Sequence, residues 1–128
     1  MKNRRRGFTL IELLLVVVII GILAAIAVPK FAATKDKAKL ASVRTDLRNV
    51  ETAEESYFSD YNVYGTLGQL QPLFLVGLSS GNSMVITAGT NGFTASANNA
   101  SITSGITSCT VQVAGGASSS VDGQITCP

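Results

Sequence analysis

The feature that most constrains this chain is an apolar run from Phe8 to Val28, close to the amino terminus. The run is 21 residues long, contains 14 Leu, Ile and Val residues, and carries a single charge, on Glu12. About 20 such residues in an α-helix span the roughly 30 Å hydrocarbon core of a bilayer. The aliphatic side chains favour insertion by about 6 kcal/mol, against about 3 kcal/mol for one central carboxylate. The sequence therefore predicts a membrane-spanning helix.

Four cations, Lys2, Arg4, Arg5 and Arg6, precede this run. The positive-inside rule keeps such a tip in the cytoplasm, so the chain after the run is predicted to lie outside. A secretory signal has the same order of regions, but its apolar part is typically about 7–15 residues long and ends at a small-residue cleavage site. The longer run and the helical pattern that continues after it favour retention of the apolar segment.

The composition excludes several classes of enzyme. The chain has no His, the commonest general base and transition-metal ligand. Beyond residue 60 the only charged side chain is Asp122, which leaves a membrane-tethered enzyme almost nothing to work with. We therefore expect no catalytic site, no metal and no cofactor, and the neutral surface gives little electrostatic basis for binding nucleic acid.

Glu12 needs an explanation of its own, because an ionisable residue at membrane depth is costly and usually functional. It either lies at the interface and is merely tolerated, or pairs with a cation of a second copy. Cleavage after Gly7 would create such a cation, the α-amine of Phe8, at about the same depth. Pairing between neighbouring copies would largely offset both desolvation costs.

Arg4-Arg-Arg-Gly7 followed by Phe8-Thr-Leu-Ile-Glu12 resembles the class III signal of type IV pilins and pseudopilins. The resemblance is strong over residues 3–31, moderate to about residue 60, and weak beyond. Its middle part, residues 46–58, is similar to the short pilins of electroactive bacteria. The resemblance implies a type IVa-like major pilin precursor with a leader at residues 1–7, cleavage between Gly7 and Phe8, N-methylation of Phe8, and Glu12 as the methylation and assembly determinant.

The function that this resemblance implies is structural: a homopolymer that forms a helical filament, stored in the inner membrane and then displayed as an extracellular pilus. The implied partners are a prepilin peptidase/methylase and a pilus assembly platform in the inner membrane. The alternative is a major pseudopilin of a type II secretion or competence system. The neutral, Ser/Thr-rich tail favours the pilus, but leaves open adhesion, motility, DNA uptake or electron transfer.

Gly21 and Pro29 match the helix-breaking pair of that family. Inside a helix, Pro costs about 3 kcal/mol and Gly about 1 kcal/mol relative to Ala. The segment between them is therefore predicted to extend in a filament. A kinked but continuous helix is the alternative, above all in the membrane, since lipid disfavours open backbone.

The sequence after the leader predicts an α+β fold. Residues 8–29 are expected to form the membrane or filament-core helix, residues 30–60 an amphipathic helix, and residues 61–128 a globular region. The apolar face shows helical spacing and comprises Leu40, Val43, Leu47, Val50, Ala53, Tyr57 and Tyr61. The opposite face is charged and changes from basic to acidic along the chain, which favours pairing between staggered copies; a solvated face is the alternative. The charged face comprises Lys35, Asp36, Lys37, Lys39, Arg44, Asp46, Arg48, Glu51, Glu54 and Glu55.

The globular region is rich in Gly, Ser, Thr and Asn, so disorder is one interpretation. Short Val-, Ile- and Thr-bearing runs between turn residues instead predict a small antiparallel sheet packed on the helix. The apolar connection at 62–82 is expected to pack as well. The runs are Ser83–Ala88, Gly92–Ala97, Ser108–Val113 and Val121–Cys127.

Cys109 and Cys127 are the only cysteines. The predicted topology places both in an oxidising compartment, where a disulfide is the default. The resemblance implies the carboxyl-terminal disulfide that brackets a surface loop in pilins. Asn99-Ala-Ser101 matches the N-glycosylation pattern, although three-residue patterns also arise by chance.

Overall fold

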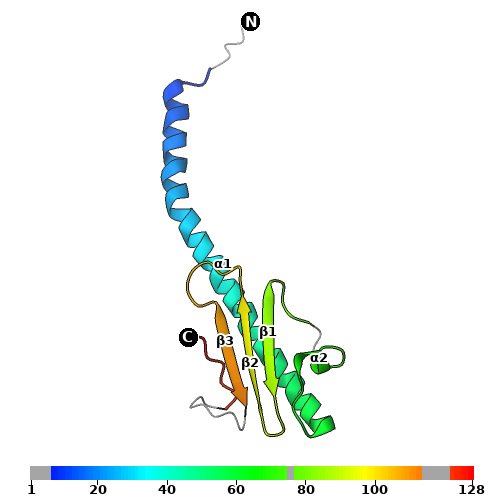
Figure 1. Ribbon diagram of the computed structural model, residues 1–128. Helices are drawn as coiled ribbons and strands as arrows, with labels where there is room; N and C mark the ends of the chain where they lie inside the picture. The colour runs from blue at the N-terminus through cyan, green and yellow to red at the C-terminus, as the bar shows by residue number, and fades with distance from the viewer. Residues whose placement is uncertain (1–6, 75–76, 114–121) are drawn as a thin grey trace, which may run out of the picture. The chain divides into compact units, whose positions relative to one another are not determined.

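The computed structural model describes residues 7–74, 77–113 and 122–128, and it confirms the predicted α+β fold. The elements shown in Figure 1 are α1 (Leu10–Tyr61), α2 (Leu67–Leu70), β1 (Asn82–Ala88), β2 (Phe93–Asn99) and β3 (Ser108–Val113). The chain divides into two compact units, Met1–Thr34 and Lys35–Pro128, and α1 contributes to both.

In the first unit, every described residue from 7 to 34 is exposed. The large apolar side chains between Phe8 and Phe31 are 47–82% exposed, so this part of the chain contains nothing that covers them. By length and composition, α1 is able to cross a membrane. Neither Gly21 nor Pro29 ends the helix, which continues through both positions in the single chain.

In the second unit, one face of α1 forms half of the hydrophobic core. Val43, Leu47 and Val50 have no exposed surface, and Ala53 and Tyr57 are also buried, as the spacing predicted. Leu40 is half-buried, whereas Tyr61 is 53% exposed, because α1 ends there. The next residue, Asn62, has a φ of 55°, the left-handed conformation that commonly ends a helix.

The sheet supplies the other half of the core. Its strand order is β1-β2-β3 and both pairs are antiparallel, with Val85 opposite Ser96 and Ser96 opposite Thr110. Alternate residues point inward, as expected for a half-buried sheet. The inward side chains that join the core cluster of α1 are Met84, Ile86, Phe93, Ala95, Ala97, Cys109 and Val111.

The prediction of a fourth strand at Val121–Cys127 is wrong over the residues of this run that the structure describes, 122–127, because they form no strand. There, only Thr126 pairs with the sheet, through an isolated antiparallel bridge to Thr110. Gly123 has a φ of 72° and its N–H donates to the carbonyl of Gln112, so the chain turns at this point instead of extending. Val121 lies outside the described residues.

The connection before the sheet packs, as predicted, but it does so through a short helix. Leu70 of α2 is fully buried, and Leu67, Phe74 and Leu78 lie partly buried against the core. Leu73 is the exception, with 72% of its side chain exposed. Two further apolar residues of this connection, Leu75 and Val76, lie outside the described residues.

Candidate functional site

The amino terminus of α1 is closed by a pair of reciprocal contacts between Thr9 and Glu12. Glu12 Oε2 accepts hydrogen bonds from the Thr9 amide at 2.9 Å and the Thr9 hydroxyl at 2.7 Å. The Glu12 amide donates in return to Thr9 Oγ1 at 3.3 Å. This capping box satisfies two of the amides that a helix start leaves without partners. The pattern Thr-x-x-Glu at residues 9–12 was a sequence signal for it.

Glu12 is therefore held at the first turn of α1 by its own chain, while the surrounding side chains remain uncovered. Phe8, the predicted first residue after cleavage, is 77% exposed, and Leu10 is 82% exposed. A carboxylate at a helix amino terminus is also favoured by the helix dipole. The first unit thus presents a fixed anion at one end of an entirely exposed apolar helix.

Three other carboxylates of α1 are buried, although the sequence pattern places them on the charged face of the helix. Asp36, Asp46 and Glu54 are 6%, 2% and 0% exposed. Each accepts hydrogen bonds from the globular region that folds against α1. Their positions follow the helical spacing of Val43, Leu47 and Val50, so they lie on the buried side of α1 despite their charge.

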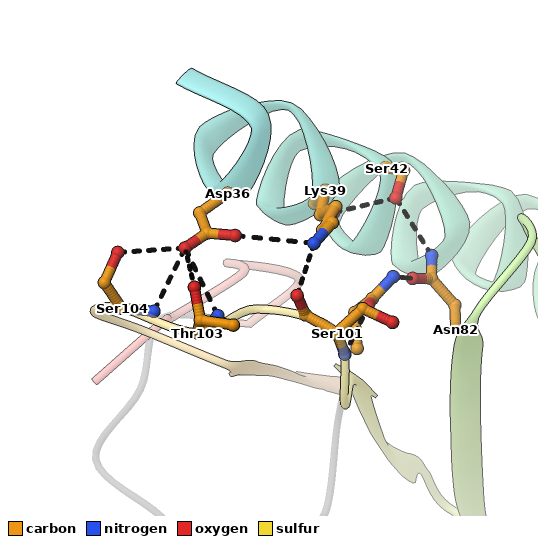
Figure 2. A network of polar contacts seen from close by, with 8 residues as sticks. Asp36, Lys39, Ser42, Asn82, Ser101, Thr103 and Ser104 are labelled. Atoms are coloured by element: carbon orange, nitrogen blue, oxygen red, sulfur yellow. Dashed lines mark hydrogen bonds and ion pairs between the residues drawn. The ribbon is translucent and has the colours of Figure 1, made fainter. Parts of the chain in front are cut away.

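Asp36 holds the loop that follows β2. Its Oδ2 accepts hydrogen bonds from the amides and hydroxyls of Thr103 and Ser104, at 2.9–3.2 Å. Figure 2 shows Lys39 beside it, 3.5 Å from Asp36 Oδ1 and in contact with the carbonyl of Ser101. The Ser104 hydroxyl, with Thr103, lowers the pKa of Asp36 to about 2, so this carboxylate is ionised at neutral pH.

Asp46 holds the start of β1. It accepts from the amide of Ser79 at 2.9 Å, the hydroxyl of Ser79 at 2.8 Å, and Asn82 Nδ2 at 2.6 Å. Asn82 Oδ1 accepts in turn from Asn99 Nδ2 at 2.7 Å. A carboxylate on α1 therefore fixes the register of the first two strands against the helix.

Glu54 holds the turn that follows α1. Its Oε2 accepts from the amide of Gly65 at 2.8 Å, while its Oε1 is buried without a hydrogen-bond partner in the described structure. Burial raises the pKa of Glu54 to about 7, and the Gly65 hydrogen bond only partly opposes this effect. Gly65 permits this close approach, because a Cβ there would lie 3.2 Å from the Tyr57 ring, which is tighter than an ordinary contact.

The predicted disulfide is present. Cys109 and Cys127 are joined, with 18 residues of sequence separation, and Arg44 Nε donates to Cys127 Sγ at 3.3 Å. The disulfide thus holds the chain terminus beside both β3 and α1.

Asn99 is placed differently from what glycosylation requires. Its side chain is 2% exposed, donates to Asn82, and accepts from the amide of Ser101 at 2.9 Å. A glycan needs an exposed amide nitrogen, so this fold argues against modification of Asn99. Among the residues that the structure describes, no cluster of three or more side chains could hold a metal ion.

Comparison with known proteins supports the resemblance. Residues 2–28 match the family described as the prokaryotic N-terminal methylation motif. The chain is 51% identical over 61 residues to the type IV major pilin protein PilA of Myxococcus xanthus, a match covering 48% of this chain and 28% of that protein. Over 68 residues it is 41% identical to the type II secretion system core protein G of Klebsiella michiganensis, covering 53% of this chain and 48% of that protein.

A third relative, the type II secretion system core protein G of Vibrio cholerae, is 44% identical over 71 residues, covering 54% of this chain and 49% of its own length. The chain thus spans less than half the length of each of these relatives. The motif at residues 2–28, the exposed apolar helix that contains it, and these similarities together show that this chain is similar to type IV pilins and type II secretion core proteins over its amino-terminal half.

Proposed function

We propose that this chain is the structural subunit of a type IV pilus, cut after Gly7 and polymerised through residues 8–29. The observation that carries the proposal is the exposed apolar surface of α1, where large side chains are 47–82% uncovered. Apolar surface on this scale needs a covering, at roughly 25 cal/mol per Å². A bilayer supplies it for the stored subunit, and the same helix of other copies supplies it in a filament.

Cleavage changes the charge of the chain as well as its length. Residues 1–7 carry four cations, so their removal changes the formal net charge from +2 to −2. It also creates the α-amine of Phe8, four residues before Glu12. The prepilin peptidase/methylase and the inner-membrane assembly platform are the partners that this cycle requires.

Glu12 supplies the assembly contact in this proposal. In hydrocarbon its carboxylate is expensive unless a cation meets it. The capping box fixes that carboxylate at the start of α1. The N-methylated amine of Phe8 of an adjacent copy then neutralises it and sets the relative position of the two chains.

A pseudopilin is the second candidate, favoured by the relatives that are named as secretion core proteins. What favours the pilus is the outer face of the sheet, which is neutral and rich in hydroxyl and amide groups. Its exposed positions include Ser83, Thr87, Ser96 and Asn98, and this surface is suited to contact with water along an extracellular filament.

Substitution at Glu12 tests the assembly contact. Glu12→Ala should leave normal amounts of subunit in the membrane but lower the yield of sheared filaments at least tenfold, because the neighbour's amine loses its partner. Glu12→Gln is the matched variant, since a Gln still accepts the Thr9 hydrogen bonds without the charge. It should behave like Glu12→Ala; normal filaments from Glu12→Gln would sink the pairing argument.

A further inference from the structure

The carboxyl-terminal segment, residues 122–128, is fixed beside β3 by its own backbone (Figure 1). Thr110 and Thr126 exchange two backbone hydrogen bonds, at 2.8 and 2.9 Å, and the amide of Gly123 donates to the carbonyl of Gln112 at 2.8 Å. None of these three bonds involves a cysteine side chain. They therefore remain available to the segment when the disulfide is reduced.

The other side of the segment faces α1. Arg44 is exposed to solvent, and its Nε donates to Cys127 Sγ at 3.3 Å. Glu51 lies against the same segment, since its Oε1 is 3.5 Å from where a Cβ on Gly123 would be. An arginine side chain is always protonated in proteins, so a permanent cation contacts one of the two sulfurs.

The two cysteines have different surroundings. Cys109 has no exposed surface and belongs to the hydrophobic core cluster, with Ala97 and Val111. Cys127 is half-buried and touches Arg44. The thiolate is the form of cysteine that reacts with disulfides, and a neighbouring cation favours it, whereas apolar burial disfavours it. Access and charge thus both favour reaction at Cys127.

We propose that Cys127 is the cysteine that attacks an external disulfide when the chain is oxidised, that Arg44 stabilises its thiolate, and that Cys109 then completes the bond from the core side. Cys127 would be the entry site for the oxidant, and Arg44 a positioning residue for it. This oxidation concerns the globular region and is independent of the proposed filament.

The reaction is a two-step thiol–disulfide exchange. The Cys127 thiolate attacks one sulfur of the external disulfide, forming a mixed disulfide, and the other sulfur leaves as a thiolate that takes up a proton. Cys109, after losing its proton to water, attacks Cys127 Sγ and releases the second thiol. Two electrons pass from the two cysteines to the external disulfide, which becomes two thiols. The Cα atoms of Cys109 and Cys127 are 4.2 Å apart, so the second attack needs no large movement.

Charged groups around Cys127 come from α1 and from the terminal segment itself. Strand β3 contributes none, because Ser108–Val113 contains no Asp, Glu, Lys or Arg. On α1, Arg48 follows Arg44 by one turn and Glu51 lies beside Gly123, while Asp122 belongs to the terminal segment. Arg44 is the one that donates a hydrogen bond to the sulfur, so its removal should affect the thiolate most.

The pH profile of alkylation tests the role of Arg44. In the full chain in detergent, Cys109→Ser leaves Cys127 as the sole thiol, and its rate of reaction with iodoacetamide is measured across pH. Adding Arg44→Gln should move the midpoint of this profile to higher pH by about one unit, because the thiolate loses its cation. Reaction at pH 7 should slow by about threefold, since the thiolate fraction falls by more than its nucleophilicity rises.

Two further variants separate charge from packing. Arg44→Lys keeps the charge, so its midpoint should stay below that of Arg44→Gln, which a purely structural role of Arg44 does not predict. Lys37→Gln is the matched control, because it removes an exposed cation of the same helix about 10 Å away along the axis. It should keep the unmodified midpoint. Circular dichroism of each variant shows that the chain remains folded.

Oxidised glutathione tests the order of the two cysteines. The chain with Cys109→Ser should form a mixed disulfide roughly tenfold faster than the chain with Cys127→Ser, measured by mass spectrometry of the intact chain. Equal rates in the folded chains would overturn Cys127 as the entry site. A midpoint that Arg44→Gln leaves unchanged would overturn the role of Arg44. Neither measurement involves filaments, so both outcomes are separate from the test of the proposed function.

Discussion

At the residue scale, the carboxylates of α1 serve two different purposes. Asp36, Asp46 and Glu54 bind amides of the globular region, whereas Glu12 lies at the start of the exposed apolar segment. A buried carboxylate that accepts several N–H and O–H hydrogen bonds stabilises the fold only while it keeps those partners. The three buried acids thus fix where the globular region sits on the second unit's part of α1.

Glu54 predicts a pH dependence of stability. Burial raises its folded-state pKa to about 7, above its ordinary value of 4.5, so the folded chain keeps a proton that the unfolded chain has released in this range. The stabilisation that the raised pKa of Glu54 contributes is full below pH 4.5 and is lost as the pH rises to about 7, a change of about 3 kcal/mol. Asp36 acts in the opposite direction, because its pKa is lowered in the folded chain. The stabilisation that it contributes is present above pH 3.8 and is lost as the pH falls from 3.8 through about 2.

Glu54→Gln should therefore flatten the decrease in thermal stability between pH 4.5 and 7, measured by circular dichroism on the full chain in detergent. Asp60→Asn is the matched control, since Asp60 is an exposed acid near the same end of α1. The control should keep the unmodified slope. An unchanged slope in Glu54→Gln would show that this carboxyl does not titrate in that range.

Periodicity predicted the apolar face of α1 correctly, but the charged face was wrong at Asp36, Asp46 and Glu54, whose partners the spacing could not predict. The Val43, Leu47 and Val50 face was evident from spacing, and Asp46 lies next to it. Whether such an acid is solvated or buried depends on an amide 33 residues later, at Ser79. Local sequence carries no signal for that contact, which only the tertiary fold creates.

At the element scale, α1 joins two environments with different requirements. Its first part is exposed throughout the described residues of its unit, 7–34, and its second part packs on a three-stranded sheet. Strands β1, β2 and β3 were predicted within two residues because their alternation matches half-buried strands. The fourth run failed because a turn at Gly123 interrupts it, although its Ile and Thr residues suit a strand.

The disulfide is the main constraint on the terminal segment, since Thr126 makes only an isolated bridge. Replacing both Cys109 and Cys127 by Ser should lower the free energy of unfolding by about 3 kcal/mol, the loop-entropy value for a loop of this size. Thermal melts of the full chain in detergent measure the change, and the unmodified chain with reductant should match the double variant. A melting temperature equal to that of the oxidised chain would contradict a stabilising role.

At the scale of the whole molecule, other copies of the chain would complete what the single chain leaves open in the proposed filament. The apolar helix needs a covering and Glu12 needs a cation. The long apolar helix and the methylation motif were evident from sequence, because length, charge and spacing determine them. The burial of Asp36, Asp46 and Glu54 required the structure, since their hydrogen-bond partners lie in the globular region.

The extended segment proposed between Gly21 and Pro29 also belongs to this scale. In the single chain α1 is continuous through both residues. Its extension in a filament stays a prediction, because only contacts with other copies supply partners for opened backbone groups.

Mass spectrometry of filaments sheared from the cell surface tests the central claim most directly. The account predicts that this chain is their main component and that its amino-terminal peptide begins at N-methylated Phe8. A filament subunit that begins at Met1 would contradict the processing step. Absence of the chain from the sheared fraction would contradict its assignment as a pilus subunit.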